Sequence, residues 1–196
     1  GSRQVYVMDA DGKYPMELTS DYVNDKPVWL PEGERIAFRT NDGADMWWWR
    51  IIDLNSFEIS DFSSPSYDPF FQTPAWSPDG SSIAMLATTR PLTSSETTME
   101  DTHVWVMKAD GTGQRDIGSV IDNRQGPPQW SADGAWVYCT VQERGDVRLY
   151  RLPAAGGAPE IVAPPAGERG VVGSWSVARD GTVAFATSCS CGFARS

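Results

Sequence analysis

Trp76-Ser77-Pro78-Asp79-Gly80 decides the fold, because this stretch recurs along the chain. Pro presets the backbone of a tight turn, and Gly accepts the left-handed conformation that closes a hairpin. The Trp before the turn has a large apolar surface to bury between sheets. The other copies are Trp29-Leu30-Pro31-Glu32-Gly33, Trp130-Ser131-Ala132-Asp133-Gly134 and the worn Val177-Ala178-Arg179-Asp180-Gly181. A structural role is therefore expected for Trp29, Trp76, Asp79, Gly80, Trp130, Asp133, Gly134, Asp180 and Gly181.

A short β-like run follows each copy of this turn. Because side chains alternate between the faces of a strand, equivalent residues of these runs share one environment. One such set is Ile36, Ile83, Val137 and Val183, and the next is Phe38, Met85, Cys139 and Phe185. Cys139 thus occupies a position otherwise filled by large apolar groups. We expect it to be a buried structural thiol.

A second motif alternates with the first. Val5 to Gly12 matches Val104 to Gly111, and partial copies begin at Trp48 and Leu149. The result is four units of four short strands, about 49 residues each, a period typical of β-propeller blades. The sequence predicts an all-β propeller of four-stranded antiparallel blades with almost no helix. Residues 1–196 are expected to form a single unit, in which 1–2 are a cloning remnant and the repeats span about 3–46, 47–102, 103–146 and 147–190.

The motifs from Ala75 to Gly80 and from Val104 to Gly111 resemble two groups of β-propeller repeats. One group is the TolB type, and the other is the propeller domain of prolyl-oligopeptidase-family serine peptidases, of the acylaminoacyl-peptidase and dipeptidyl-peptidase type. The stretches Leu149 to Leu152 and Ser176 to Phe185 resemble the peptidase propellers more closely. In those peptidases a separate α/β-hydrolase domain carries the catalytic serine.

This sequence has no Gly-x-Ser-x-Gly motif, so no catalytic residue is assigned to it. The resemblance implies a non-catalytic propeller that gates and selects substrates for a serine peptidase. The alternative is a TolB-like propeller for protein–protein interaction. A third hypothesis is a stand-alone propeller lyase acting on uronic-acid sugars, which fits poorly with the net charge of −10 and the single histidine.

The order of the motifs leaves the closure of the ring open. Three blades are complete if each starts with the Trp strand, and the two end pieces add up to a fourth. The chain can therefore form a closed small ring, a half-ring of a dimer, or part of a larger propeller. Exposed sheet edges invite association, so homo-oligomers are one expectation.

Two long insertions fall on the face opposite the Asp-Gly turns, at 60–73 and 88–102. Long loops on a rigid scaffold are the usual place for binding residues. Their aromatic and acidic side chains would suit a cationic or amino-terminal peptide, or a partner domain. The candidate binding residues are Tyr67, Asp68, Phe70, Phe71, Arg90, Glu96, Glu100 and Asp101.

The net charge of −10 disfavours binding to nucleic acids and to anionic membrane surfaces. No apolar run approaches the roughly 20 residues that a membrane helix needs. The sequence does not fix the compartment: a cytoplasmic location is favoured, and an extracytoplasmic one would accompany a TolB-like role.

No metal or other cofactor is expected. His103 is the only histidine, and it matches Gln4 of the first repeat at the start of a strand. Asp9 to Gly12 is interpreted as a turn rather than a calcium loop, because Ser20 stands where an EF-hand has its twelfth-position Glu. The run from Trp47 to Trp49 is explained by burial on both faces of a blade. Cys189 and Cys191 follow the last strand and indicate no disulfide framework.

Overall fold

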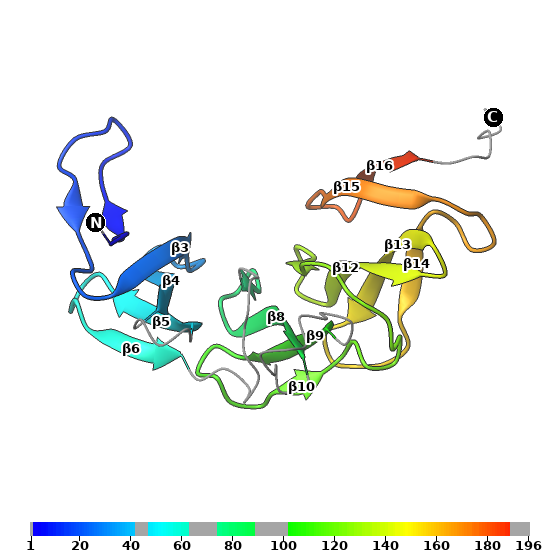
Figure 1. Ribbon diagram of the computed structural model, residues 1–196, viewed down its shortest axis with the longest axis horizontal. Helices are drawn as coiled ribbons and strands as arrows, with labels where there is room; N and C mark the ends of the chain where they lie inside the picture. Colours follow the sequence, from blue (N-terminus) through cyan, green and yellow to red (C-terminus); the bar gives the residue numbers. More distant parts are fainter. Residues whose placement is uncertain (1, 42–46, 63–73, 89–101, 189–196) are drawn as a thin grey trace.

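The computed structural model describes residues 2–41, 47–62, 74–88 and 102–188. Within these ranges every regular element is a β-strand, as the repeats predict. Figure 1 shows the sheets following one another along an open arc, with the N-terminal hairpin at one end and strands β15 and β16 at the other. None of the described residues forms a helix long and apolar enough to cross a membrane.

Three blades are complete, and in each the four strands pair antiparallel in chain order. The first comprises β3 (Val23–Trp29), β4 (Arg35–Asn41), β5 (Trp47–Asp53) and β6 (Ile59–Phe62). The second comprises β7 (Ala75–Trp76), β8 (Ser82–Thr88), β9 (Thr102–Lys108) and β10 (Arg115–Asp116). The third comprises β11 (Gln129–Trp130), β12 (Trp136–Glu143), β13 (Asp146–Pro153) and β14 (Glu160–Ala163).

The two ends of the arc are half-blades. The first is the hairpin of β1 (Tyr6–Val7) and β2 (Met16–Glu17), and the last is the pair β15 (Val171–Val177) and β16 (Val183–Ser188). One parallel pairing between Val147 and Val171 joins the last pair to the third blade in a six-stranded sheet. The predicted division into three blades and two end pieces is confirmed. Closure of the ring and association between copies stay predictions.

The recurring turns form as the sequence predicts. The Ser77 hydroxyl donates to Asp79 Oδ1 at 2.6 Å, and Asp79 accepts the Ser81 amide at 3.1 Å. Gly80 follows with φ of +71°. Because it accepts these bonds, led by that from Ser77, the pKa of Asp79 falls to about 2. The third blade repeats the pattern, with Ser131 donating to Asp133 at 2.5 Å and Gly134 at φ +70°.

The strand register confirms the predicted equivalences. Trp76 pairs with Ile83, Trp130 with Val137, and the worn copy pairs Val177 with Val183. Cys139 is fully buried as expected, and this burial raises the pKa of its thiol to about 12. It packs in the core cluster between the second and third blades.

Phe185 departs from the expected core position, because its side chain is 38% exposed. Its equivalents Phe38, Met85 and Cys139 are all buried. Those three residues pack towards the preceding sheet, whereas Phe185 belongs to no described core cluster and lies on β16, the last strand of its sheet. The repeat position alone therefore does not determine whether an apolar residue is buried.

The tryptophans before the turns also differ in exposure. Trp130 is 8% exposed, and its indole nitrogen donates to the Ala75 carbonyl of the preceding blade at 2.8 Å. Trp29 is 51% exposed, so the expectation that it is buried is wrong. The half-blade before it supplies only β1 and β2 among the described residues, and neither is an inner strand equivalent to β7.

The run of three tryptophans starts β5, and its register aligns Trp49 with Val104 of the second blade. Trp49 is fully buried in the core between the first two blades. Trp48 lies on the other face of the strand, where its ring meets Tyr22 edge-on with centroids 6.5 Å apart. Trp49 is thus buried and Trp48 half-buried on the opposite face, while the Trp47 side chain lies outside the described part of the structure.

Replacing Trp130 by Ala should lower the free energy of unfolding by about 3–5 kcal/mol, because it empties a buried site. Trp29→Ala is the matched control, since the same repeat position is half exposed there, and it should cost less than about 1 kcal/mol. Urea unfolding followed by circular dichroism measures both. Equal losses would contradict the role of blade-on-blade burial.

Cys139 should be inert in the folded chain, because its thiol is buried and stays protonated below about pH 12. A variant carrying Cys189→Ser and Cys191→Ser isolates this thiol. We expect no reaction with an aromatic disulfide reagent at pH 8, and one equivalent after unfolding in urea. Stoichiometric labelling of the folded variant would contradict the core position.

Candidate functional site

One face of the arc carries the connections between blades and the turns between the second and third strands of each blade. We call this the loop face; the Asp-Gly turns lie on the other. Strand parity predicts that the two long insertions fall on this face. Their candidate residues lie outside the described part of the structure: Tyr67, Asp68, Phe70, Phe71, Arg90, Glu96, Glu100 and Asp101. Cys189 and Cys191 do too.

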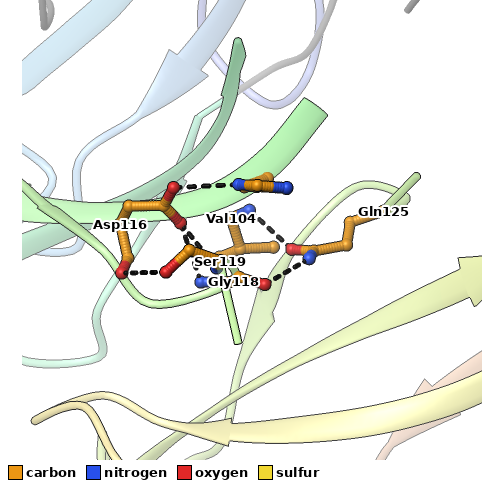
Figure 2. Close-up of polar contacts among 6 residues, drawn as sticks. Val104, Asp116, Gly118, Ser119 and Gln125 are labelled. Carbon is orange, nitrogen blue, oxygen red and sulfur yellow. Dashed lines mark hydrogen bonds and ion pairs between the residues drawn. The ribbon is translucent and has the colours of Figure 1, made fainter. Parts of the chain in front are cut away.

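The described part of the loop face is dominated by residues 117–128, the segment that connects β10 to β11. Asp116 anchors the start of this connecting segment, as Figure 2 shows. Its Oδ1 accepts the backbone amides of Gly118 at 3.0 Å and Ser119 at 2.8 Å. Its Oδ2 lies 2.9 Å from Nδ1 of His103 on β9.

Gln125 holds the other end of the segment (Figure 2). Its side chain is almost fully buried; Oε1 accepts the Val104 amide at 2.7 Å, and Nε2 donates to the Gly118 carbonyl at 2.7 Å. A Cβ on Gly118 would stand 2.1 Å from Gln125 Oε1 and 2.7 Å from the Val104 nitrogen. The network therefore requires glycine at 118, and it fixes both ends of the segment to β9.

His103 belongs to this scaffold. It is 8% exposed, and its pairing with Asp116 ties β9 to the connecting segment. The predicted equivalence with Gln4 holds, since Gln4 performs the same task in the first repeat by accepting from Thr19 at 2.7 Å and Asn24 at 2.9 Å. The described contacts of His103 are those of an anchor for a loop.

Two hollows open on the loop face above the third blade. The smaller, of about 230 Å³, is lined by Leu86, Arg124, Gln125, Gly126, Pro127, Thr140 and Gln142. The larger, of about 520 Å³, is lined by Asn123, Glu143, Arg144, Asp146 and Arg148. They adjoin, because consecutive residues of the connecting segment and of β12 line one and then the other. Together we call them the loop-face groove.

The first blade shows what fills the equivalent space elsewhere. Asn24 pairs with Thr40 as Gln125 pairs with Val141, so the registers of the two blades can be compared directly. Where the third blade has Gly126 beside Thr140, the first has Asp25 bonded twice to Arg39, at 2.8 and 2.7 Å. The smaller hollow exists because the third blade lacks these two long side chains.

The larger hollow has a similar origin. The registers of β5 and β13 place Trp48 of the first blade and Arg148 of the third at one position. In the first blade, Tyr22 packs against Trp48, and the residue equivalent to Tyr22 in the third blade is Asn123. The third blade thus has the polar side chains of Asn123 and Arg148 where the first blade has the aromatic pair Tyr22 and Trp48.

The charged side chains of the groove differ in whether they have partners within the chain. Glu143 accepts from the Tyr150 hydroxyl at 2.7 Å and lies 3.5 Å from Arg148. Burial, with this carboxylate next in importance, raises the pKa of Tyr150 to about 12. Asp146 accepts the Gly170 amide at 3.1 Å and pairs with Arg169 at 3.3 Å. The side chains of Arg124 and Arg144, in contrast, bond to no side chain or carbonyl that the structure describes.

A further groove, of about 550 Å³, lies between the second and third blades on the face of the Asp-Gly turns. Its lining includes Asp79, Asp133 and Trp130. Arg115 closes one side by donating to the carbonyls of Ala154 at 3.0 Å and Ala155 at 2.8 Å. Its polar groups are thus occupied by the turns and by the contact between the blades.

The connecting segment and the loop-face groove are not among the sites that the sequence predicts. The segment runs from Ile117 to Pro128, and its length alone gives a weak signal. A stronger signal lies in the repeat alignment, where Gly126 and Thr140 replace Asp25 and Arg39. Smaller side chains at two paired positions of one repeat indicate a hollow between them.

The comparisons with known proteins agree with this architecture. The family model of the lipoprotein LpqB β-propeller domain matches residues 65–186, which is more than half of the chain. TolB from Acinetobacter baumannii superposes with a TM-score of 0.68 at 18% identity, over 96% of this chain and 44% of TolB.

Peptidases give similar agreement. A puromycin-hydrolyzing peptidase from Mycobacterium tuberculosis superposes with a TM-score of 0.67 at 17% identity, over 95% of this chain and 32% of the peptidase. A prolyl endopeptidase gives 0.60 at 15% identity, over 88% and 28%. The chain therefore spans less than half the length of each of these proteins. Identities this low establish the fold alone, which is that of a TolB-like and peptidase-like β-propeller.

Replacing Gly118 by Ala should disrupt the network under the loop face, because the new methyl group collides with Gln125 and the Val104 backbone. We expect a loss of about 1–3 kcal/mol in the free energy of unfolding, the range for breaking buried hydrogen bonds. Gly173→Ala is the matched control, since the nearest atom to its Cβ is 3.9 Å away. Urea unfolding measures both, and equal stability of the two variants would contradict the role of Gly118.

Proposed function

Because the chain belongs to the lipoprotein LpqB β-propeller domain family, we propose that it is a non-catalytic binding propeller that receives a peptide or a partner domain on its loop face. The loop-face groove carries this proposal. Its rim is a segment locked at both ends by buried hydrogen bonds, so the groove is preformed. Preformed, concave surfaces on a rigid scaffold, with a few polar groups that fix the ligand, are typical of binding sites.

Several features support binding rather than catalysis on this chain. The described residues form propeller strands and their connections. The one histidine is buried and contacts Asp116, where it anchors a loop. The sequence contains no Gly-x-Ser-x-Gly motif for an α/β-hydrolase nucleophile.

The first candidate for the biological role is a propeller that gates a serine peptidase and selects its substrates. Its support is the similarity to a puromycin-hydrolyzing peptidase and a prolyl endopeptidase, together with the repeats Leu149 to Leu152 and Ser176 to Phe185. The second is a TolB-like interaction propeller, supported by an equally good superposition on TolB and by the lipoprotein family model.

Reading the natural coding sequence downstream of Ser196 distinguishes these two roles. A following α/β-hydrolase domain with a Gly-x-Ser-x-Gly motif would favour the peptidase gate. A following segment without such a domain would favour the interaction propeller. In both roles the loop face is the surface that meets the ligand.

The binding proposal is tested by selecting peptides from a displayed random library on the immobilised chain. Gln142→Trp places a bulky ring on the rim of the smaller hollow, and Ala132→Trp places one on the opposite face as the matched control. We expect the selected peptides to bind Gln142→Trp at least about tenfold more weakly and Ala132→Trp unchanged. Failure to select peptides, or losses confined to Ala132→Trp, would contradict binding on the loop face.

A further inference from the structure

We propose that the loop-face groove recognises an acidic peptide segment, whose carboxylate side chains are bound by Arg124 and Arg144. This inference rests on the proposed binding function and gives the ligand its chemistry. It follows from three observations: how the groove is opened, which of its charges are already engaged, and how its walls are held.

The smaller hollow lies where the first blade has a largely buried ion pair. In the first blade Asp25 and Arg39 bond to one another at the position of the smaller hollow, both side chains are largely buried, and Asp25 also lies 3.4 Å from Arg3. In the third blade Gly126 and Thr140 stand there, and the Gly126 amide bonds to the Thr140 carbonyl at 2.7 Å. The Thr140 hydroxyl takes up the part of this space next to Gly126, because a Cβ there would collide with it, and the remainder is the smaller hollow, which is open to a ligand.

The remaining charge of the lining is positive. Three arginines and two carboxylates line the two hollows, in a chain whose net charge is −10. Both carboxylates have partners, Glu143 in Tyr150 and Arg148, and Asp146 in Gly170 and Arg169. The Arg124 and Arg144 side chains have no such partner among the described residues. A ligand that brought carboxylates would complete the pairing.

Arginine is suited to this task. Its planar guanidinium donates two parallel hydrogen bonds to a carboxylate, and such charged bonds are roughly twice as strong as neutral ones. One arginine lines the smaller hollow and the other lines the larger, so they address two separate anionic groups. Two acidic side chains on one extended segment match this arrangement.

The walls of the groove are preorganised. The Arg124 carbonyl accepts the Gln142 amide at 3.0 Å, which fixes the backbone of the connecting segment against β12. The Arg148 side chain donates to the Glu168 carbonyl at 2.9 Å, which fixes the far wall. A ligand thus meets a surface whose backbone needs no reordering, which reduces the entropic cost of binding.

The test uses an array of random hexapeptides, acetylated and amidated so that they carry no terminal charge, probed with the whole chain. We expect Asp and Glu to be enriched over Asn and Gln among the binders, and binding to weaken between about 50 and 500 mM salt as the charges are screened. Arg124→Gln and Arg144→Gln should each weaken binding of an acidic hexapeptide about tenfold. Arg144→Glu should abolish the preference for acidic residues.

The matched control is Arg179→Gln, which removes an exposed arginine from the turn face and should leave binding unchanged. Gln142→Trp separates the two proposals. If peptides bind and this variant blocks them, the loop face is the binding surface, and enrichment without acidic residues overturns the present inference alone. If no peptide is blocked by it, the binding function itself fails.

Three further results, measured on this array and on companion arrays with free termini or with phosphoserine, would overturn the acidic assignment in favour of another ligand. Enrichment of Lys, Arg or free amino termini would assign recognition to the aromatic and acidic residues of the two long insertions. Binding restored only by a free carboxyl terminus would assign the groove to a chain end. Binding only of phosphoserine peptides would assign it to phosphate.

Discussion

Burial of each blade against the next is the constraint on which this structure depends. A four-stranded antiparallel sheet has two faces, and each needs a cover of apolar side chains. The contact between the second and third blades shows the full arrangement, where Trp130 is buried and donates to Ala75 of the preceding blade. At the start of the arc no inner strand equivalent to β7 precedes Trp29 among the described residues, and Trp29 is exposed. Equivalent positions of the repeat thus have different environments, depending on where their blade lies along the arc.

The repeat leaves certain positions free to vary once the blade contacts are satisfied. The start of the third strand shows this most clearly, since its register places Gln4, Trp48, His103 and Arg148 at equivalent sites on the loop face. Gln4 and His103 anchor neighbouring segments, Trp48 packs on Tyr22, and Arg148 lines a hollow. The same repeat position therefore holds a neighbouring segment in some blades, packs against an aromatic ring in another, and lines a hollow in a third. Such variation lets a fold with a common scaffold carry different binding surfaces.

The fold was predictable from the sequence because its signals are local and repeated: the residues of each Asp-Gly turn act within a few positions of one another. The exposure of Trp29 could not be foreseen from its motif, because it depends on whether a preceding inner strand covers it. The groove was harder still to predict from the sequence, because it arises where large side chains are absent. Sequence reasoning favoured the longest loops, which lie outside the described residues, whereas the groove arises from Gly126 and Thr140, brought together by strand pairing.

The net charge of the chain bears on how such a groove would operate. A total of −10 repels an acidic ligand at long range, but at physiological salt the charges are screened over about 8 Å. Within that distance the ligand meets the local set of charges, in which Glu143 and Asp146 are already paired. Net charge then mainly slows the encounter, while Arg124 and Arg144 determine which ligand stays. An acidic surface around two available arginines therefore favours selectivity over speed, since an acidic ligand that does not reach them gains no contact to offset the repulsion.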